Sequence, residues 1–411
     1  HKRVLLTIHS PLPLAGEGPG ERVSEMTTSG FSETLSLNPS PASGRGTFYG
    51  MGVIFGIETH VPVNGKTPAQ RKEHDQAVGA GTMSRSGAKC PCCGTLMTME
   101  DIRFEGRGGR LGSVMTAVVV DGQKGKEYRL PTPHEITMAE AAGAEIERVF
   151  KEVPFGLPEE QTPKGGNGAA RAFSVDAYGF DQWKKLFTPR QLVGLGEFIK
   201  YTRQFKIKAK ESGYSNDWVE AISQYLCCVI DRLADAGSTI THWQLKGEFI
   251  VNTFQRFALP INWDFSEVNT LAGLTGSYES AVNWVSLAVN HFLSTINSSS
   301  LLKIVKNSAI SEADVKGIYD SIITDPPYYD AIPYSDLMDF FYIWLRRTLH
   351  GLSSEIDQAF AEPLAPKWNH VANDGELIDD ASRFNGDKAA SKQNYEDGMA
   401  RAFQACHAAL K

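Results

Sequence analysis

Two observations predict an α/β protein. First, a short apolar run, Ile322 and Ile323 within the stretch 321–330, is stopped by an acid, two prolines and two aromatic residues. An apolar run closed by turn residues is typical of a buried strand that ends at a functional edge. Second, longer segments such as 188–210 and 216–236 repeat apolar residues at helical spacing. Because ligands of open α/β sheets lie outside the carboxyl ends of the strands, we expect the chemistry at residues 325–328.

Length and composition set broad limits. The chain has 411 residues, enough for two or three domains. It lacks a run of about 18 apolar residues, so no membrane span is expected, and its basic start has too short an apolar stretch for a signal peptide. A cytoplasmic location is therefore the default. The net charge of −7 argues against a protein coated with basic residues, but it is compatible with a local basic groove.

The chain divides into three regions. Residues 1–50 are rich in Pro, Gly and Ser, and we expect a disordered, repeat-like tail. Residues 51–165 form an insertion region that ends in the flexible linker Pro163–Gly168. Residues 166–411 hold most of the helical patterns and the 325–328 stretch.

The clearest helix signals lie in this third region. Thr188 and Pro189 open one helix as its N-cap and first helical residue. Its last turns carry three lysines that could meet DNA phosphate, but cations also suit a helix C-terminus, and we favour the second interpretation. Ser335 is expected to cap a strongly apolar helix over 336–349, with aromatic residues in the core. A final amphipathic helix is expected over 391–410.

Two motifs lie in the insertion region. Cys90 and Cys93 have the spacing of a zinc knuckle, with Gly94 where the chain must turn. Structural zinc is almost always four-coordinate and no second pair with this spacing follows, so zinc binding stays one of two alternatives. The six cysteines form no disulfide framework, which indicates a reducing compartment. Residues 106–112 hold four glycines and two arginines, and we favour a solvated hairpin turn between two strand-like pieces over a phosphate site.

The stretch Asp325-Pro-Pro-Tyr328 carries residue types suited to transferring a group to an exocyclic amine. The Asp325 carboxylate can accept a hydrogen bond from an NH2 group, and Pro326, which has no N–H, leaves its carbonyl as a second acceptor. Two acceptors would draw the nitrogen out of conjugation and aim its lone pair outward. Tyr328 offers a flat face on which a flipped base can stack, worth about 1–3 kcal/mol. The alternative is an ordinary β-turn, in which these residue types are common.

Seven stretches of the chain occur in an order that is more specific than the tetrapeptide alone. They are Cys90–Gly94, Glu105–Gly112, Leu186–Leu192, Asn252–Phe254, Trp263–Asn269, Thr324–Asp330 and Tyr334–Leu345. Together they resemble one family, the large adenine-specific DNA methylases that contain a zinc ribbon. Asp-Pro-Pro-Tyr is the signature of the amino-methyltransferases, which methylate adenine N6 or cytosine N4.

The resemblance implies a Rossmann-like methyltransferase that uses S-adenosylmethionine, acts on DNA and carries a long insertion with a zinc-ribbon-like and a helical, DNA-contacting part. Carried over, Asp325, Pro326, Pro327 and Tyr328 form the catalytic loop, and Cys90 and Cys93 match one zinc-ligand pair. Residues 166–411 would be a partial methyltransferase domain. The glycine-rich cofactor loop of the family is not found, so the fold is expected to be incomplete, as in an internal fragment, and no cofactor-binding residue is assigned.

These expectations lead to one preferred function and two alternatives. The preferred function is site-specific methylation of adenine N6 in DNA, with S-adenosylmethionine as methyl donor and zinc as a second candidate cofactor. The first alternative is a DNA-binding remnant without catalysis, which the missing cofactor loop favours. The second is methylation of cytosine N4 or another planar amine, because the tetrapeptide activates any planar NH2 group.

Overall fold

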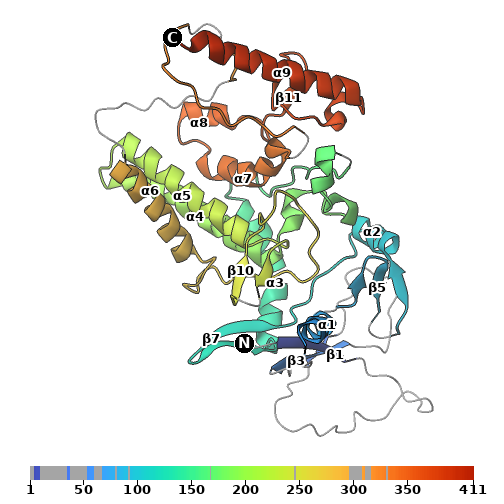
Figure 1. Ribbon diagram of the computed structural model, residues 1–411. Coiled ribbons are helices and arrows are strands. Elements are labelled where there is room, and N and C mark those ends of the chain that lie inside the picture. Colours follow the sequence, from blue (N-terminus) through green and yellow to red (C-terminus); the bar gives the residue numbers. More distant parts are fainter. Residues whose placement is uncertain are drawn as a thin grey trace, which may run out of the picture. The chain divides into compact units, whose positions relative to one another are not determined.

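The computed structural model describes residues 4–9, 35–37, 53–59, 67–78, 81–90, 93–166, 168–244, 247–295, 308–310, 316–329 and 332–411 (Figure 1). The chain divides into two compact units. The first comprises residues 1–141 and 245–248, and the second comprises residues 142–244 and 249–411. Helix α3, Pro133–Phe150, runs across the boundary.

The first unit combines small antiparallel sheets with short helices. One sheet has the order β1-β3-β2, the next β4-β5-β6, and β7 pairs with β8. The strands are β1 (Val4–His9), β2 (Leu35–Leu37), β3 (Val53–Thr59), β4 (Met83–Ser84), β5 (Gly87–Lys89), β6 (Leu96–Thr98), β7 (Val118–Gly122) and β8 (Gly125–Arg129), and the helices are α1 (Pro68–Val78) and α2 (Met99–Arg107). Within the expected tail of residues 1–50, the structure describes β1 and β2 alone; the rest of that prediction lies outside the described residues.

The glycine-rich stretch at 106–112 differs from its prediction. The residues before it form helix α2 and not a strand, so no hairpin turn is made there. Thr98 caps α2 through a capping box in which its side chain accepts from the Asp101 amide and Asp101 accepts from the Thr98 amide. Arg110 turns back to Glu105, with 2.5 Å between Nε and Oε2. The local capping signal therefore outweighs the strand-like composition.

The second unit is mainly helical. Helix α4 packs beside α5, α5 beside α6, and α7 contacts both α4 and α5 (Figure 1). Its elements are α4 (Pro189–Glu211), α5 (Asn216–Ala236), β9 (His242–Gln244), β10 (Phe249–Val251), α6 (Tyr278–Thr295), α7 (Tyr334–Leu349), α8 (Ser354–Ala359), β11 (Trp368–Asn369), β12 (Asp374–Gly375) and α9 (Lys388–Ala409), with short 3-10 helices at Gly168–Ala172, Asp176–Tyr178, Trp183–Leu186 and Ala381–Phe384. The helices predicted from Pro189 and over 216–236 are confirmed.

Helix α7 carries much of the core of this unit. Phe340 and Trp344 are fully buried, and their rings contact Phe187 at centroid distances of 5.5 and 5.2 Å. This confirms the prediction that the aromatic residues of α7 belong to the core. The predicted cap is wrong: α7 begins at Tyr334, and Ser335 lies inside it, donating to Glu376 Oε2 at 2.5 Å.

The mixed α/β class is confirmed, but the predicted buried strand is wrong. All named strands of the described residues pair antiparallel, in sheets of two or three strands. Residues 321–328 form neither strand nor helix, and Ile323 is 95% exposed. A buried parallel strand needs a neighbour on each edge and a cover on each face. In the described residues this stretch has only one isolated parallel bridge beside it, between Tyr319 and Leu410. No helix of the described residues is long and apolar enough to cross a membrane.

Candidate functional site

The Asp325–Tyr328 loop lies in the second unit and precedes the start of α7. Its recognition groups are open. Asp325 and Pro326 are exposed, and Tyr328 is 58% exposed. Among the described residues, neither the Asp325 carboxylate nor the Pro326 carbonyl has a hydrogen-bond partner. Within the part of the chain that the structure describes, the two acceptors predicted for an amine therefore form no hydrogen bond.

The backbone just after these groups is anchored. The Tyr395 hydroxyl of α9 donates to the Pro327 carbonyl at 2.8 Å, and the Tyr329 amide donates to the same hydroxyl at 3.3 Å. The Asp379 amide donates to the Tyr329 carbonyl at 3.0 Å. Asp379 is in turn held by Ser391 of α9, whose hydroxyl donates to its carboxylate at 2.6 Å. The loop thus presents open side chains on a backbone that α9 fixes.

A network of charged side chains surrounds the start of α7. Arg383 bonds the carboxylates of Asp336 at 2.8 Å and Glu376 at 2.7 Å. Burial, the largest single influence, lowers the pKa of Arg383, but Glu376 and Asp336 together outweigh it and raise that pKa. Lys367 bonds Asp339, which is 1% exposed, at 2.8 Å. Burial raises the pKa of Asp339 to about 6 despite this lysine.

These contacts give the network a structural role. Three acids and two bases satisfy one another, and they tie α7 to residues 367–383. One atom is an exception: Arg383 Nη1 is buried and has no hydrogen-bond partner among the described residues.

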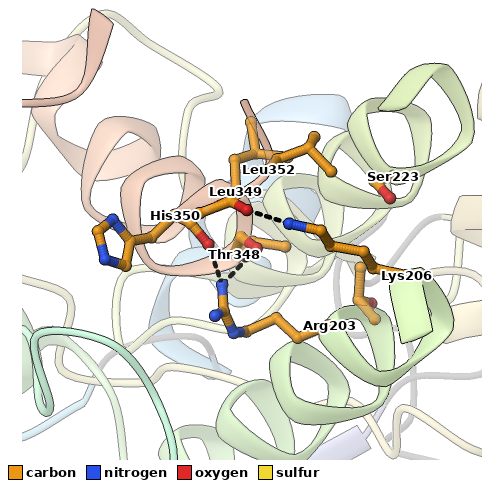
Figure 2. Close-up of a pocket in the computed structure, with 9 residues that line it drawn as sticks. Arg203, Lys206, Ser223, Thr348, Leu349, His350 and Leu352 are labelled. Atoms are coloured by element: carbon orange, nitrogen blue, oxygen red, sulfur yellow. Dashed lines mark hydrogen bonds between the residues drawn. The ribbon is translucent and has the colours of Figure 1, made fainter. Parts of the chain in front are cut away.

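A separate pocket of about 300 Å³ lies between α4, α5 and the C-terminal end of α7. Figure 2 shows Arg203 and Lys206 of α4 reaching carbonyl oxygens there. The Arg203 guanidinium donates to the carbonyls of Thr348 at 3.1 Å and His350 at 2.8 Å, and the Lys206 ammonium donates to the Gly351 carbonyl. Burial lowers the pKa of both groups.

This pocket does not belong to the Asp325–Tyr328 loop. Helix α7 has 16 residues and is therefore about 24 Å long. The loop precedes its N-terminal end, and the pocket lies at its C-terminal end. The Arg203 guanidinium donates to carbonyls of the last turn and C-cap of α7, which the helix leaves unpaired, and Lys206 donates to the Gly351 carbonyl just beyond them. The expectation that these cations serve the C-terminus of α4 does not hold for Lys206, which bonds the Gly351 carbonyl beyond the end of α7, whereas Lys208 and Lys210 lie in the last turn of α4.

The Cys90 and Cys93 pair lies on a hairpin turn in the first unit, between β5 and β6. The Gly94 amide donates to the Cys90 carbonyl at 2.9 Å, and Gly94 adopts a positive φ of 74°. The Cys93 thiol donates to Thr95 Oγ1 at 3.2 Å. Hydrogen bonding with Thr95, and then with Cys90, holds the pKa of Cys93 below its ordinary value.

The turn fits one half of a zinc knuckle, in which glycine permits the reversal that brings two thiols together. Among the residues that the structure describes, no group of three or more His, Cys, Asp or Glu side chains is placed to hold a metal. Cys92 lies outside the described residues. Within the described residues, the donor set is therefore two ligands short of a structural zinc site.

The described residues do not provide a recognisable cofactor site. The glycines of 273–276 lie in turns before α6, where Gly273 and Gly276 have φ values of 67° and 88°. A Cβ on Gly276 would lie 3.3 Å from the side chains of Ile250 and Val268, so this glycine serves close packing. No strand leads into it as a dinucleotide-binding turn requires.

Sequence reasoning found the loop but missed the residues that hold it. Tyr395 and Asp379 belong to no recognised motif, and a single tyrosine in a polar helix gives no signal of a contact 68 residues away. Asp325, Pro326 and Tyr328 lie together because they are adjacent in sequence, whereas Cys90 and Cys93 belong to the other unit. Comparison with family models, curated proteins and solved structures finds no match to this chain.

Proposed function

We propose that this chain carries the amine-binding loop of a DNA adenine N6-methyltransferase with an incomplete Rossmann-like domain. One observation carries the proposal: the loop has its acceptors open and its backbone anchored. An exposed surface turn would satisfy its own carboxylate by capping nearby amides, as Asp and Asn do in turns. The Asp325 carboxylate caps no amide of the described residues, although Asp387 caps α9 in that way.

The roles follow from the chemistry of the free groups. The Asp325 carboxylate and the Pro326 carbonyl accept from the amine of a flipped adenine, and Tyr328 stacks on its ring. Pro327 keeps the turn rigid and gives its own carbonyl to Tyr395. S-adenosylmethionine supplies an activated methyl group when bound. Most of the rate then comes from positioning the amine in a desolvated site. The amine loses its proton after transfer, to Asp325 or to water.

The decisive experiment measures methyl transfer with the full chain. Tritiated S-adenosylmethionine and duplex DNA are incubated with the protein, and digested DNA is examined for N6-methyladenine and N4-methylcytosine by mass spectrometry. Asp325→Asn should abolish transfer while leaving folding intact. Asp320→Asn is the matched control, since Asp320 is an exposed acid five residues earlier that pairs with Lys411. Equal activity of the Asp325→Asn and unmodified chains would reject the mechanism. If the methyl label were found on cytosine and not on adenine, the acceptor base would be cytosine, but the proposed role of the loop would stand.

A second candidate is DNA binding without catalysis. The absence of a glycine-rich cofactor turn among the described residues favours it. Isothermal titration with S-adenosylmethionine separates the two candidates. Binding at micromolar concentration supports the enzyme. No heat with the cofactor, together with a shift of labelled duplex DNA in a gel, supports the binding remnant.

A further inference from the structure

The side chain of Tyr395 makes two hydrogen bonds to the backbone of the amine-binding loop. Its hydroxyl donates to the Pro327 carbonyl at 2.8 Å and accepts from the Tyr329 amide at 3.3 Å. A phenol has one proton to donate and lone pairs to accept, so both bonds form at once. The Tyr395 and Tyr329 rings also meet edge to face, with centroids 4.9 Å apart.

These two bonds bracket Tyr328. One is made by the residue before it and the other by the residue after it, so both peptide groups that flank Tyr328 are held. The Tyr328 side chain itself makes no contact of this kind and remains 58% exposed. A clamp of this form fixes the backbone that carries the Tyr328 ring without covering the face of the ring.

The loop needs such a clamp because its backbone is strained. Tyr329 has a φ of 21°, in a region that residues other than glycine rarely adopt. Strain of this kind persists only where surrounding contacts hold it. Here the contacts are the Tyr395 hydroxyl on one side of Tyr329 and the Asp379 amide, 3.0 Å from its carbonyl, on the other.

We propose that Tyr395 is a positioning residue for the amine acceptor site. Its hydroxyl holds the Pro327–Tyr329 backbone so that the Pro326 carbonyl and the Tyr328 ring keep one relative orientation. The role in transfer rests on the proposed function, but the clamp itself does not. Tyr395 touches no reacting atom and acts through the loop.

The test compares Tyr395→Phe with the unmodified full chain. The substitution keeps the ring and removes the hydroxyl, and circular dichroism checks that the variant is folded. Hydrogen–deuterium exchange at the Tyr329 amide should rise by about two- to tenfold, the range expected for one lost hydrogen bond. Methyl transfer should lose about a hundredfold in kcat, as for a small misplacement of reacting groups, with KM for DNA nearly unchanged. Tyr319→Phe, which alters another exposed tyrosine of the same unit, is the control and should change neither readout.

Each outcome has a separate meaning. Unchanged exchange at Tyr329 in Tyr395→Phe would overturn the clamp, whatever the activity. Tyr395→Leu also removes the ring. If exchange at the Tyr329 amide rose in Tyr395→Leu but not in Tyr395→Phe, ring packing and not the hydroxyl would hold the loop, and the clamp would again be overturned. Faster exchange together with an unmodified chain that transfers no methyl group would leave the clamp standing and reject the proposed function. Faster exchange with unaltered kcat would overturn the positioning role.

Discussion

The two ends of helix α7 make opposite use of polar groups. At the C-terminal end, cations and carbonyls of the same chain pair with one another: Arg203 and Lys206 donate to carbonyls in the last turn of the helix and just beyond it. Before the N-terminal end, Asp325 and the Pro326 carbonyl have no partner among the described residues, while the backbone beside them is anchored. The pocket, with its two cations, is therefore the less suitable ligand site. Free groups on a fixed backbone are the better indicator of function.

This comparison predicts that substitutions at the C-terminal end cost stability, whereas substitutions in the loop cost function. The largest stability effect is expected for Arg347, which is 1% exposed. It donates to the carbonyls of Gly156 and Leu157 at 2.8 and 2.9 Å and pairs with Glu160 at 3.0 Å. Arg347→Met leaves Glu160 without its buried partner and should lower the free energy of unfolding by about 3–5 kcal/mol.

Urea denaturation measures this loss. Lys208→Met is the control, because Lys208 is an exposed cation on α4, and it should change the free energy of unfolding by about 0.5 kcal/mol or less. A loss below about 1 kcal/mol for Arg347→Met would mean that the hydrophobic replacement packs well enough to offset the lost bonds.

The next effect is a pH dependence from Asp339 in the first half of α7. Burial raises its pKa from 3.8 to about 6, so the folded state binds the proton more tightly than the unfolded state. The free energy of unfolding should therefore fall as pH rises from about 4 to about 6, by about 2–3 kcal/mol, and then level off. Asp339→Asn should remove this part of the slope and keep the bond from the Ala365 amide. Parallel slopes for the two proteins across this window would contradict the assignment.

A smaller stability effect is expected for Arg203. Arg203→Met removes the donors to the Thr348 and His350 carbonyls and should lower the free energy of unfolding by about 1–2 kcal/mol. Thermal unfolding against the Lys208→Met control measures it. Inorganic phosphate should not stabilise the unmodified chain through these groups. A rise in melting temperature with phosphate that Arg203→Met abolishes would make the pocket an anion site after all.

The smallest stability effect is expected for Tyr328, whose substitution should impair base stacking and hardly change the free energy of unfolding. Its ring is 58% exposed, so Tyr328→Ala should alter the free energy of unfolding by less than about 0.5 kcal/mol. Binding of DNA with 2-aminopurine in place of adenine should lose the fluorescence change of a stacked, flipped base. If Tyr328→Ala kept this signal, Tyr328 would not belong to the proposed site. If Tyr328→Ala were strongly destabilised, the loop would contribute to stability, contrary to the contrast between the two ends of α7.

The sequence alone determined the features that depend on neighbours along the chain. The Thr188 N-cap with Pro189 at the first helical position, the apolar face of α5 and the turn at Gly94 are local, and each forms as predicted. The Asp325–Tyr328 loop was found for the same reason, since its four residues are consecutive.

Only the tertiary structure decided what each of these features contacts. The apolar run at Ile322 and Ile323 predicts a buried strand, yet burial needs neighbouring strands that the described residues do not supply. Ser335 is a residue type that often caps helices, but its hydroxyl donates to the carboxylate of Glu376, 41 residues away. Tyr395 reaches the loop across 68 residues. Long-range contacts of this kind depend on how the helices pack. They produce no periodic pattern in the sequence, so composition and spacing could not predict them.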